Sequence, residues 1–196
     1  AQAPRREGFR ETAWWLQTQE QILERVRQSL QGLSAMAEDM TPVRFETKFD
    51  AVPVWESPDG RERLLLHGIV DRVDRCADGA CRIIDYKTAG PWQFGRKTLE
   101  EGKKLQLPLY ALAIKKVWGE EIRDGFYWHV QQAEASPLRL QAYGVSQSME
   151  DALRFAREAI EGIRSGAFEP HPPAGGCPSY CPAAPFCWSF RPVYGG

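Results

Sequence analysis

An acid and an amine stand two positions apart in the segment IIDYKT, residues 83–88. Its isoleucines form an apolar β-type run that leads directly into Asp85 and Lys87. Because strand side chains return to the same face every second residue, this carboxylate and this ammonium group share one face. A second aspartate, Asp71, lies in a comparable run, GIVDRVD, at residues 68–74. The two runs are therefore candidates for joint chemistry.

The loop between these runs determines whether the two aspartates meet. If residues 78–79 formed a two-residue hairpin loop, Asp71 would lie opposite Tyr86 and its carboxylate would point to the other face. With a three-residue loop, residues 77–79, that ends in a left-handed glycine, Asp71 lies opposite Asp85. Their Cβ atoms would then be about 4.5–5.5 Å apart. Carboxylates at that separation repel each other unless a cation lies between them.

Oxygen ligands favour a hard divalent cation, Mg²⁺ or Mn²⁺ rather than zinc, with coordination positions left for water and a substrate phosphate. Lys87 would then hold or deprotonate the attacking water, or neutralise the charge that develops on phosphorus. The pattern is typical of metal-assisted phosphodiester hydrolysis. The alternative is an ordinary exposed charge ladder on a sheet, formed by Asp71, Arg72, Asp74 and Lys87.

Hydrophobic periodicity predicts the elements before this hairpin. Residues 11–31 place apolar side chains at helical spacing, which predicts an amphipathic helix that ends near Gly32. Residues 43–55 alternate, which predicts a strand with Glu46 on one face and, on the other, Val43, Phe45, Thr47 and Phe49.

The second half of the chain continues the α/β pattern. Residues 98–119 predict a helix whose regular part starts shortly before Pro108. Residues 122–131 and 137–144 predict two further strands. A closing helix follows, with Ser148 as its N-cap and Gly166 as its stop. These elements are sufficient for one domain with a tail.

Composition limits the classes of function. The 196 residues are 43% hydrophobic and carry a formal net charge of only −1, so any nucleic-acid partner must meet a local basic patch. No apolar run approaches the roughly 20 residues of a membrane helix, and the N-terminus lacks a signal-peptide core. We therefore expect a cytoplasmic protein without a membrane partner. The absence of an initial methionine suggests a domain cut from a longer chain.

Three motifs in order resemble those of the PD-(D/E)XK nuclease superfamily: GIVDRVD at residues 68–74, IDYKT at 84–88 and QLPLY at 106–110. The similarity is to the RecB-like and AddB-like branch, which includes CRISPR-associated RecB-like exonucleases, and it covers roughly residues 43–190. It implies an α/β (α+β) fold with a restriction-endonuclease-like core, a central mixed sheet flanked by helices. The core would span residues 1–170, with a Cys-rich tail at residues 171–196.

The resemblance also implies roles for the hairpin residues. Asp71 and Asp85 match the family's metal-binding acids, and the main-chain carbonyl of Tyr86 matches a further ligand. Lys87 matches the catalytic lysine.

Other positions match the family less directly. Gln106 and Tyr110 match its helix motif, and as an i, i+4 pair they would lie on one helix face, turned toward the active site and DNA. Glu46 resembles the acid on the preceding strand, and its alternative is a solvated strand carboxylate. For Arg72 two interpretations stay open, a contact with backbone phosphate or a salt bridge to Asp74 or Glu46.

The tail resembles a metal-binding segment. It carries three cysteines, and in the family three cysteines at this place join one upstream cysteine to hold a [4Fe–4S] cluster. Here no cysteine precedes Cys76, and Cys76 and Cys81 flank the hairpin turn, so the fourth ligand would lie outside this chain. Zinc with His171 as the fourth ligand, or free thiols, are the alternatives. The cysteines form a C-x3-C-x5-C pattern at Cys177, Cys181 and Cys187.

A second departure concerns histidine. Family members carry a metal-binding histidine on a helix well before the aspartate motif, whereas no histidine here precedes His67. We expect structural roles for His67 and His129. Truncation of a longer chain would explain both the absent histidine and the absent cysteine, and it would leave the fragment slow or inactive alone.

The partners follow from the resemblance and from local charge. The resemblance implies a divalent-metal deoxyribonuclease that acts as an exonuclease on DNA ends. It also implies that the domain works beside a helicase subunit in a helicase–nuclease complex for DNA repair. The rival hypothesis is a non-catalytic, cluster-stabilised DNA-binding or subunit-docking domain. Two basic clusters could follow DNA phosphates: Arg5, Arg6 and Arg10, and Arg96, Lys97, Lys103 and Lys104.

Overall fold

The chain is described by a computed structural model that covers residues 8, 12–36, 40–172 and 175–192. It divides into two compact units, residues 1–156 and residues 157–196. The first unit contains the whole sheet and the residues of the three motifs. The second contains the end of the last helix and the Cys-rich tail.

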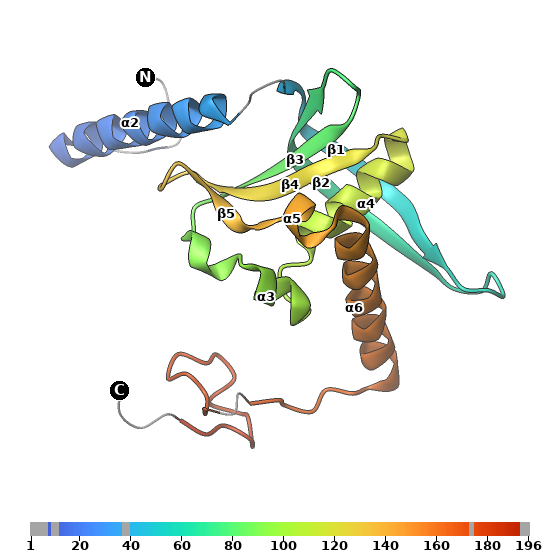
Figure 1. Ribbon diagram of the computed structural model, residues 1–196. Helices are drawn as coiled ribbons and strands as arrows, with labels where there is room; N and C mark the ends of the chain where they lie inside the picture. The colour runs from blue at the N-terminus through green and yellow to red at the C-terminus, as the bar shows by residue number, and fades with distance from the viewer. Residues whose placement is uncertain (1–7, 9–11, 37–39, 173–174, 193–196) are drawn as a thin grey trace. The chain divides into compact units, whose positions relative to one another are not determined.

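A five-stranded mixed sheet forms the centre of the first unit (Figure 1). The strands lie in the order β1-β2-β3-β4-β5, and every neighbouring pair is antiparallel except β3 and β4, which are parallel. The predicted α/β architecture with a mixed sheet is confirmed. The strands are β1 (Met40–Glu56), β2 (Arg63–Cys76), β3 (Cys81–Lys87), β4 (Ile122–His129) and β5 (Glu134–Arg139).

Helices cover the sheet. A parallel strand pair needs a long crossover, and α4 provides it between β3 and β4. As predicted, α4 is regular from just before Pro108. The helices are α2 (Ala13–Ala35), the 3₁₀ turn η1 (Pro91–Gln93), α3 (Arg96–Glu100), α4 (Gln106–Trp118), α5 (Leu140–Tyr143) and α6 (Val145–Ser165).

Strand β3 is buried on both faces, which explains its nearly continuous apolar run. On one face Ile83 joins the larger core with Val73, Tyr127 and α4. On the other face Ile84 packs with Phe126, Trp128 and the end of α2. The next side chains along β3 continue this alternation. Asp85 and Lys87 therefore lie on the face that α4 covers, and Tyr86 lies on the opposite face.

The long β1–β2 ribbon is kinked beside the GIVDRVD motif. Glu46 has a left-handed φ of 44°, and in the register it lies between the pairs that contain Arg72 and Val70. Val70 and Val73 both enter the same core although they are three positions apart, so the alternation of β2 is interrupted between them. The alternation predicted for residues 43–55 fails in β1, because its register with β2 shifts between Pro42 and Arg44 and again between Phe49 and Val52, and Phe45 is 60% exposed whereas Phe49 is buried.

Three helix and strand limits differ from prediction. Helix α2 continues through Gly32, where a Cβ atom would lie 3.0 Å from the Trp128 ring, so this glycine serves a close approach and not a stop. The strand predicted for residues 137–144 ends at Arg139. Ser148 lies inside α6 and donates to the carbonyl of Val145 at 2.7 Å, so it is not the N-cap. Each of these three differences concerns a residue whose role depends on how it packs against other elements of the fold.

The second unit starts within α6, whose end at Gly166 agrees with prediction because this glycine has a left-handed φ of 71°. Beyond it the chain has little regular structure. Cys177 and Pro192 form an isolated bridge, supported by a 2.6 Å hydrogen bond from Cys177 N to Arg191 O. Within the described residues, every helix lacks an apolar stretch long enough to cross a lipid bilayer.

Candidate active site

The hairpin has the register that brings the two aspartates together. Strands β2 and β3 pair from Arg75–Cys81 to Arg72–Ile84, around a loop of residues 77–79. Gly79 has a left-handed φ of 88°. Of the two loops that the sequence allows, the structure therefore has the three-residue loop. One position beyond the Arg72–Ile84 pair, the same register sets Asp71 opposite Asp85.

At the end of the β2–β3 ladder, the side chain of Asp71 takes the place of a main-chain hydrogen-bond acceptor. Its Oδ2 accepts a hydrogen bond from the main-chain N–H of Tyr86 at 2.8 Å, in place of a strand carbonyl. Because Tyr86 stands between Asp85 and Lys87, this bond ties the Asp71 carboxylate to the backbone of the IIDYKT segment. The glycine of the GIVDRVD motif also has a packing role. A Cβ atom on Gly68 would lie 2.7 Å from the Phe49 ring.

Asp85 is a buried carboxylate next to a second acid and one ammonium group. It is 1% exposed. The nearest charge is the Lys87 ammonium, whose Nζ lies 2.5 Å from Oδ2 of Asp85 as an ion pair. Burial raises the pKa of Asp85 above its ordinary value, Lys87 partly offsets this rise, and the charge of Asp71 adds to it. A cation at this position would therefore be stabilised.

Lys87 connects the strand to α4. Its Nζ donates to Oε1 of Gln106 at 3.0 Å, and Nε2 of Gln106 donates to the hydroxyl of Tyr110 at 3.1 Å. The structure thus brings Lys87, Gln106 and Tyr110 into one chain of hydrogen bonds. Sequence reasoning missed Tyr127, whose ring centroid lies 5.4 Å from the Lys87 ammonium.

Glu46 is not gathered into this group. It is exposed at the kink of β1, beside Asp71 in the register. Among the described residues, no three His, Cys, Asp or Glu side chains come close enough together to hold a metal ion. The catalytic role that the resemblance implies for Glu46 therefore stays a prediction.

The donor set fits a hard divalent cation better than zinc. Two carboxylates, Asp71 and Asp85, supply oxygen donors, and the Asp85 carboxylate is buried. The Tyr86 carbonyl, between Asp85 and Lys87 in the chain, is the third candidate. Oxygen donors of this kind suit Mg²⁺ and Mn²⁺.

The charges on the other face of the hairpin form a closed network. Nε of Arg72 donates to Asp74 at 2.6 Å, and Arg82 donates to the same carboxylate at 2.9 Å. Asp74 is fully buried and Arg72 is 8% exposed. The salt-bridge interpretation of Arg72 is therefore confirmed. The exposed charge ladder is wrong for Arg72 and Asp74, which are buried, whereas Asp71 and Lys87 are partly exposed.

Two histidines lie outside the acid pair. His67 is exposed and contacts Asp50 on the neighbouring strand. His129 is fully buried, and its Nδ1 contacts the carbonyl oxygen of Ala89 at 2.5 Å. The packing of His129 agrees with a structural role.

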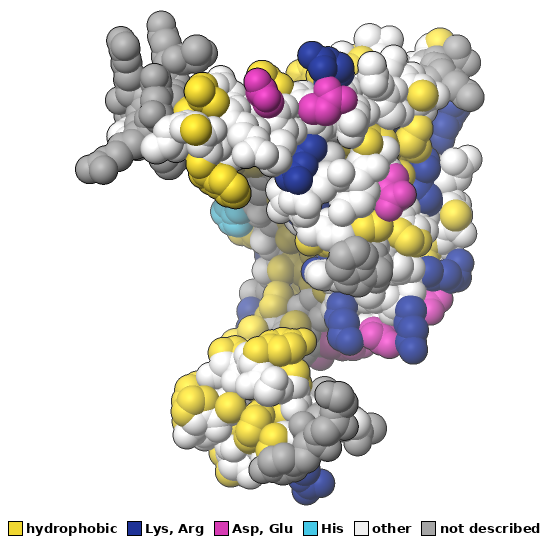
Figure 2. All heavy atoms as spheres, turned by 90° about the vertical axis from the view of Figure 1, so that its left-hand side faces the viewer, with side chains coloured by type: hydrophobic (Ala, Val, Ile, Leu, Met, Phe, Trp, Pro, Cys, Tyr) yellow, Lys and Arg dark blue, Asp and Glu magenta, His cyan; other side chains and the backbone are white. Residues whose placement is uncertain are grey.

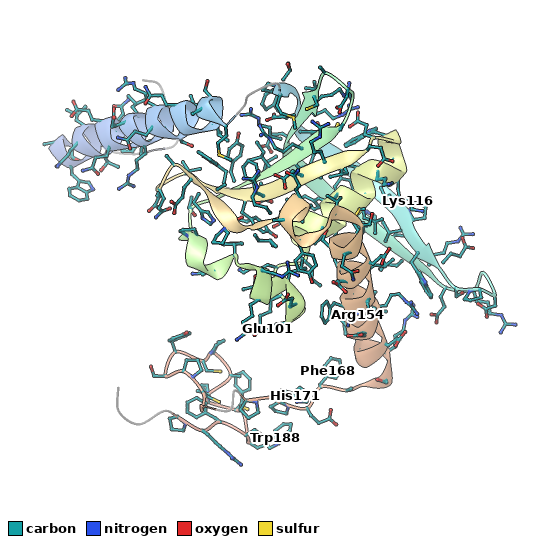
Figure 3. All side chains as sticks on the ribbon, in the orientation of Figure 1. Glu101, Lys116, Arg154, Phe168, His171 and Trp188 are labelled. Carbon is teal, nitrogen blue, oxygen red and sulfur yellow. The ribbon has the colours of Figure 1, made fainter. Side chains whose placement is uncertain are left out.

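The predicted basic cluster near α3 is largely neutralised by local ion pairs. Arg96 pairs with Glu100 at 2.8 Å, and Lys103 pairs with Glu101, labelled in Figure 3, at 2.9 Å. In Figure 2 positive and negative side chains alternate over the visible face. The second predicted cluster, Arg5, Arg6 and Arg10, lies outside the described residues.

The tail does not gather its cysteines into a metal site. Cys177 is buried, whereas Cys181 and Cys187 are partly exposed, and none belongs to a metal-binding group among the described residues. His171, labelled in Figure 3, is exposed on the chain that follows α6. Three cysteines are one ligand short of a four-thiolate cluster. The described part of the tail therefore does not fit the expected [4Fe–4S] cluster or the zinc alternative.

Comparisons with known proteins agree with this geometry. Three relatives from Streptococcus pyogenes, of serotypes M3, M49 and M1, are named as a subunit of an ATP-dependent helicase/deoxyribonuclease, and each is 37% identical over 76 residues. The match covers 37% of this chain and 7% of each relative, so the chain spans only a small part of their length. A sequence model of the PD-(D/E)XK nuclease superfamily matches residues 1–188. The chain therefore belongs to the PD-(D/E)XK nuclease superfamily.

Proposed function

We propose that this chain is a divalent-metal-dependent deoxyribonuclease that hydrolyses phosphodiester bonds of DNA as an exonuclease. The observation that carries the proposal is the buried Asp85 carboxylate, which the register of the hairpin, continued by one position, sets opposite a second acid, Asp71. The Lys87 ammonium lies 2.5 Å from Asp85 Oδ2 and offsets one of these two negative charges. The negative charge that remains would be offset by a bound cation.

Asp71, Asp85 and the carbonyl of Tyr86 would hold Mg²⁺ or Mn²⁺. When bound, such an ion polarises the scissile phosphate and makes water a better nucleophile. Asp71 is held without the ion, because its carboxylate accepts the hydrogen bond of the Tyr86 N–H. The raised pKa of Asp85 follows first from burial, and binding of a cation at this carboxylate would favour its charged form.

Lys87 acts on the substrate as a hydrogen-bond donor and a positive charge. Its ammonium group lies between the Asp85 carboxylate and the Gln106 amide, so its direction is set by both. From this place it would stabilise the negative charge that develops on the phosphoryl oxygens and hold the attacking water. Tyr110 extends the same hydrogen-bond chain along α4 toward the DNA.

The partner of this domain is a helicase. The relatives are named as subunits of ATP-dependent helicase/deoxyribonucleases. A nuclease domain carried by such a subunit would receive DNA ends from the helicase and take part in DNA repair. The neutral charge of the chain agrees with delivery by a partner, because the net charge of −1 provides little long-range attraction for DNA.

A second candidate is a non-catalytic subunit-docking domain. It is favoured by the apolar side chains that α2 leaves at the surface, among which Trp14 is 77% exposed and Leu23 and Leu30 are each 58% exposed. Such a helix face suits contact with another protein segment. This candidate gives no reason for the Asp71, Asp85 and Lys87 group.

Cleavage of end-labelled linear DNA separates the two candidates. Single- and double-stranded DNA would be incubated with Mg²⁺ or Mn²⁺ and, in parallel, with EDTA. We expect cleavage that requires metal and that falls by roughly 10²- to 10⁴-fold in Lys87→Ala, since a positioned lysine contributes an effect of that size. Lys115→Ala, which removes an exposed lysine of α4 paired with Glu121, is the control and should retain activity.

Equal cleavage by the Lys87→Ala and Lys115→Ala variants would contradict the assigned site. No cleavage by the unaltered chain, in a sample shown to be folded, would favour the docking domain.

A further inference from the structure

Helix α4 begins without a cap from its own sequence. The residue at its N-cap, Leu105, makes no side-chain capping bond, and the preceding segment EGKK has no serine, threonine, asparagine or aspartate. The first N–H groups of a helix need partners outside the helix. Here the partner comes from strand β4, because the N–H of Leu107 donates to the hydroxyl of Tyr127 at 3.2 Å.

The same hydroxyl holds the loop before the helix. Tyr127 donates to the carbonyl of Lys104 at 3.0 Å. Lys104 has a left-handed φ of 55°, a conformation that is strained for a residue with a side chain and persists only where the surroundings enforce it. One phenol therefore clamps both sides of the turn that leads into Gln106.

Tyr127 also lies directly beneath the site residues. It is 1% exposed and is the register neighbour of Asp85 in the parallel β3–β4 pair. Its ring centroid is 5.4 Å from the ammonium nitrogen of Lys87. Burial raises the pKa of Tyr127 far above its usual value, so the hydroxyl keeps the proton that it donates.

We propose that Tyr127 is a positioning residue for the nuclease reaction, with its ring under the Lys87 ammonium and its hydroxyl fixing the first turn of α4. The inference rests on the proposed function. Gln106 belongs to that first turn and accepts from Lys87 at 3.0 Å, so a shift of the turn would move both groups away from each other. Tyr127 acts through them, because it is buried and does not reach a substrate.

Tyr127→Phe removes the hydroxyl and keeps the ring, so it tests the clamp without emptying the core. We expect kcat for cleavage of linear DNA with Mg²⁺ to fall by roughly 10- to 100-fold, because a displacement of about 1 Å has an effect of that size. KM for DNA should change by less than about twofold, since no binding group is removed.

Tyr143→Phe is the matched control. It also removes one tyrosine hydroxyl, which donates to Asp151 at 2.9 Å, but this bond joins the α5–α6 region and not α4. Tyr143 is only half-buried and its hydroxyl makes one hydrogen bond against two for Tyr127, so the smaller loss of stability is expected in the control. The expected kcat of the control is that of the unaltered protein.

Two measurements do not depend on activity. Amide hydrogen exchange of Leu107 reports the cap, and the NMR signal of the Lys87 ammonium reports its surroundings. In Tyr127→Phe we expect faster exchange of Leu107 and a changed Lys87 signal, and neither change in Tyr143→Phe. A merely structural tyrosine would not move the Lys87 signal.

An unchanged Lys87 signal in Tyr127→Phe would overturn the proposal, even with faster exchange at Leu107, because the clamp would then not reach the catalytic group. An unchanged kcat in a folded variant would also overturn it. If the unaltered protein does not cleave DNA, the proposed function fails, and the Leu107 and Lys87 measurements still decide whether Tyr127 positions this pair.

Discussion

The two faces of the β2–β3 hairpin carry buried aspartates of opposite character. On one face Asp74 is 0% exposed and accepts three hydrogen bonds from two arginines, Arg72 at 2.6 and 3.1 Å and Arg82 at 2.9 Å. On the other face Asp85 is 1% exposed, has the Lys87 ammonium at 2.5 Å as its cationic partner, and feels the charge of a second acid, Asp71. Burial alone therefore does not identify a functional acid. The balance of neighbouring charges does, because two acids beside one ammonium group leave a negative charge that a bound cation can offset.

The face that carries Asp74 and its two arginines also has a structural task. Arg82 donates to the carbonyl of Met36, next to the end of α2, at 3.0 Å. Arg72 reaches the hydroxyl of Tyr86 at 3.4 Å, behind the backbone that carries Asp85. The network of Asp74, Arg72 and Arg82 thus stabilises one face of the sheet. Asp85 and Lys87, on the α4 face, stay available to bind a ligand.

The largest expected effect comes from opening the closed network. Asp74→Asn would leave two buried guanidinium groups without their carboxylate, so we expect the free energy of unfolding to fall by about 3–5 kcal/mol. Urea unfolding measures it. The triple variant Asp74→Leu, Arg72→Met, Arg82→Met should lose much less, because it leaves no unpaired charge. A small loss in the single variant would mean that Asp74 does not hold this network.

A smaller effect of opposite sign is expected on the α4 face. Asp85→Asn should raise the free energy of unfolding at pH 7 by roughly 0.5–2 kcal/mol, because active-site acids are commonly kept at the expense of stability. The same variant should lose metal-dependent cleavage. A decrease in stability would show that the Lys87 ion pair already satisfies this carboxylate.

The pH dependence of that difference has a definite sign. Burial raises the pKa of Asp85 in the folded state, so between the unfolded and the folded pKa the folded protein holds a proton that the unfolded chain has released. Stability of the unaltered protein then falls as pH rises through this window. The advantage of Asp85→Asn should be absent below the unfolded pKa and complete above the folded one. Urea titrations in EDTA at several pH values measure it.

The smallest effect is expected at the rim of the α4 face. Glu46 is exposed and is not gathered with the two aspartates, so Glu46→Gln should change Mn²⁺ affinity by no more than about twofold, the size of an ordinary surface substitution. Titration of Mn²⁺ followed by its paramagnetic signal would measure this. A loss as large as that of Asp71→Asn would place Glu46 among the metal ligands.

Local sequence was enough to find much of the fold and the site. The apolar run that leads into Asp85, the position of Pro108 and the glycine at Gly166 correctly predicted a strand, the start of α4 and the end of α6. The three motifs named the residues that the hairpin and α4 bring together. These features depend on periodicity and turn geometry, which act between residues close together in the chain.

The remaining features depend on contacts between distant parts of the chain. Either of two hairpin loops was compatible with the sequence, and only the folded ladder shows the register that sets Asp71 opposite Asp85. The kink at Glu46 and the cap on α4 from Tyr127 join residues on different strands and helices. No local pattern encodes such contacts, because each depends on how a neighbouring element is packed.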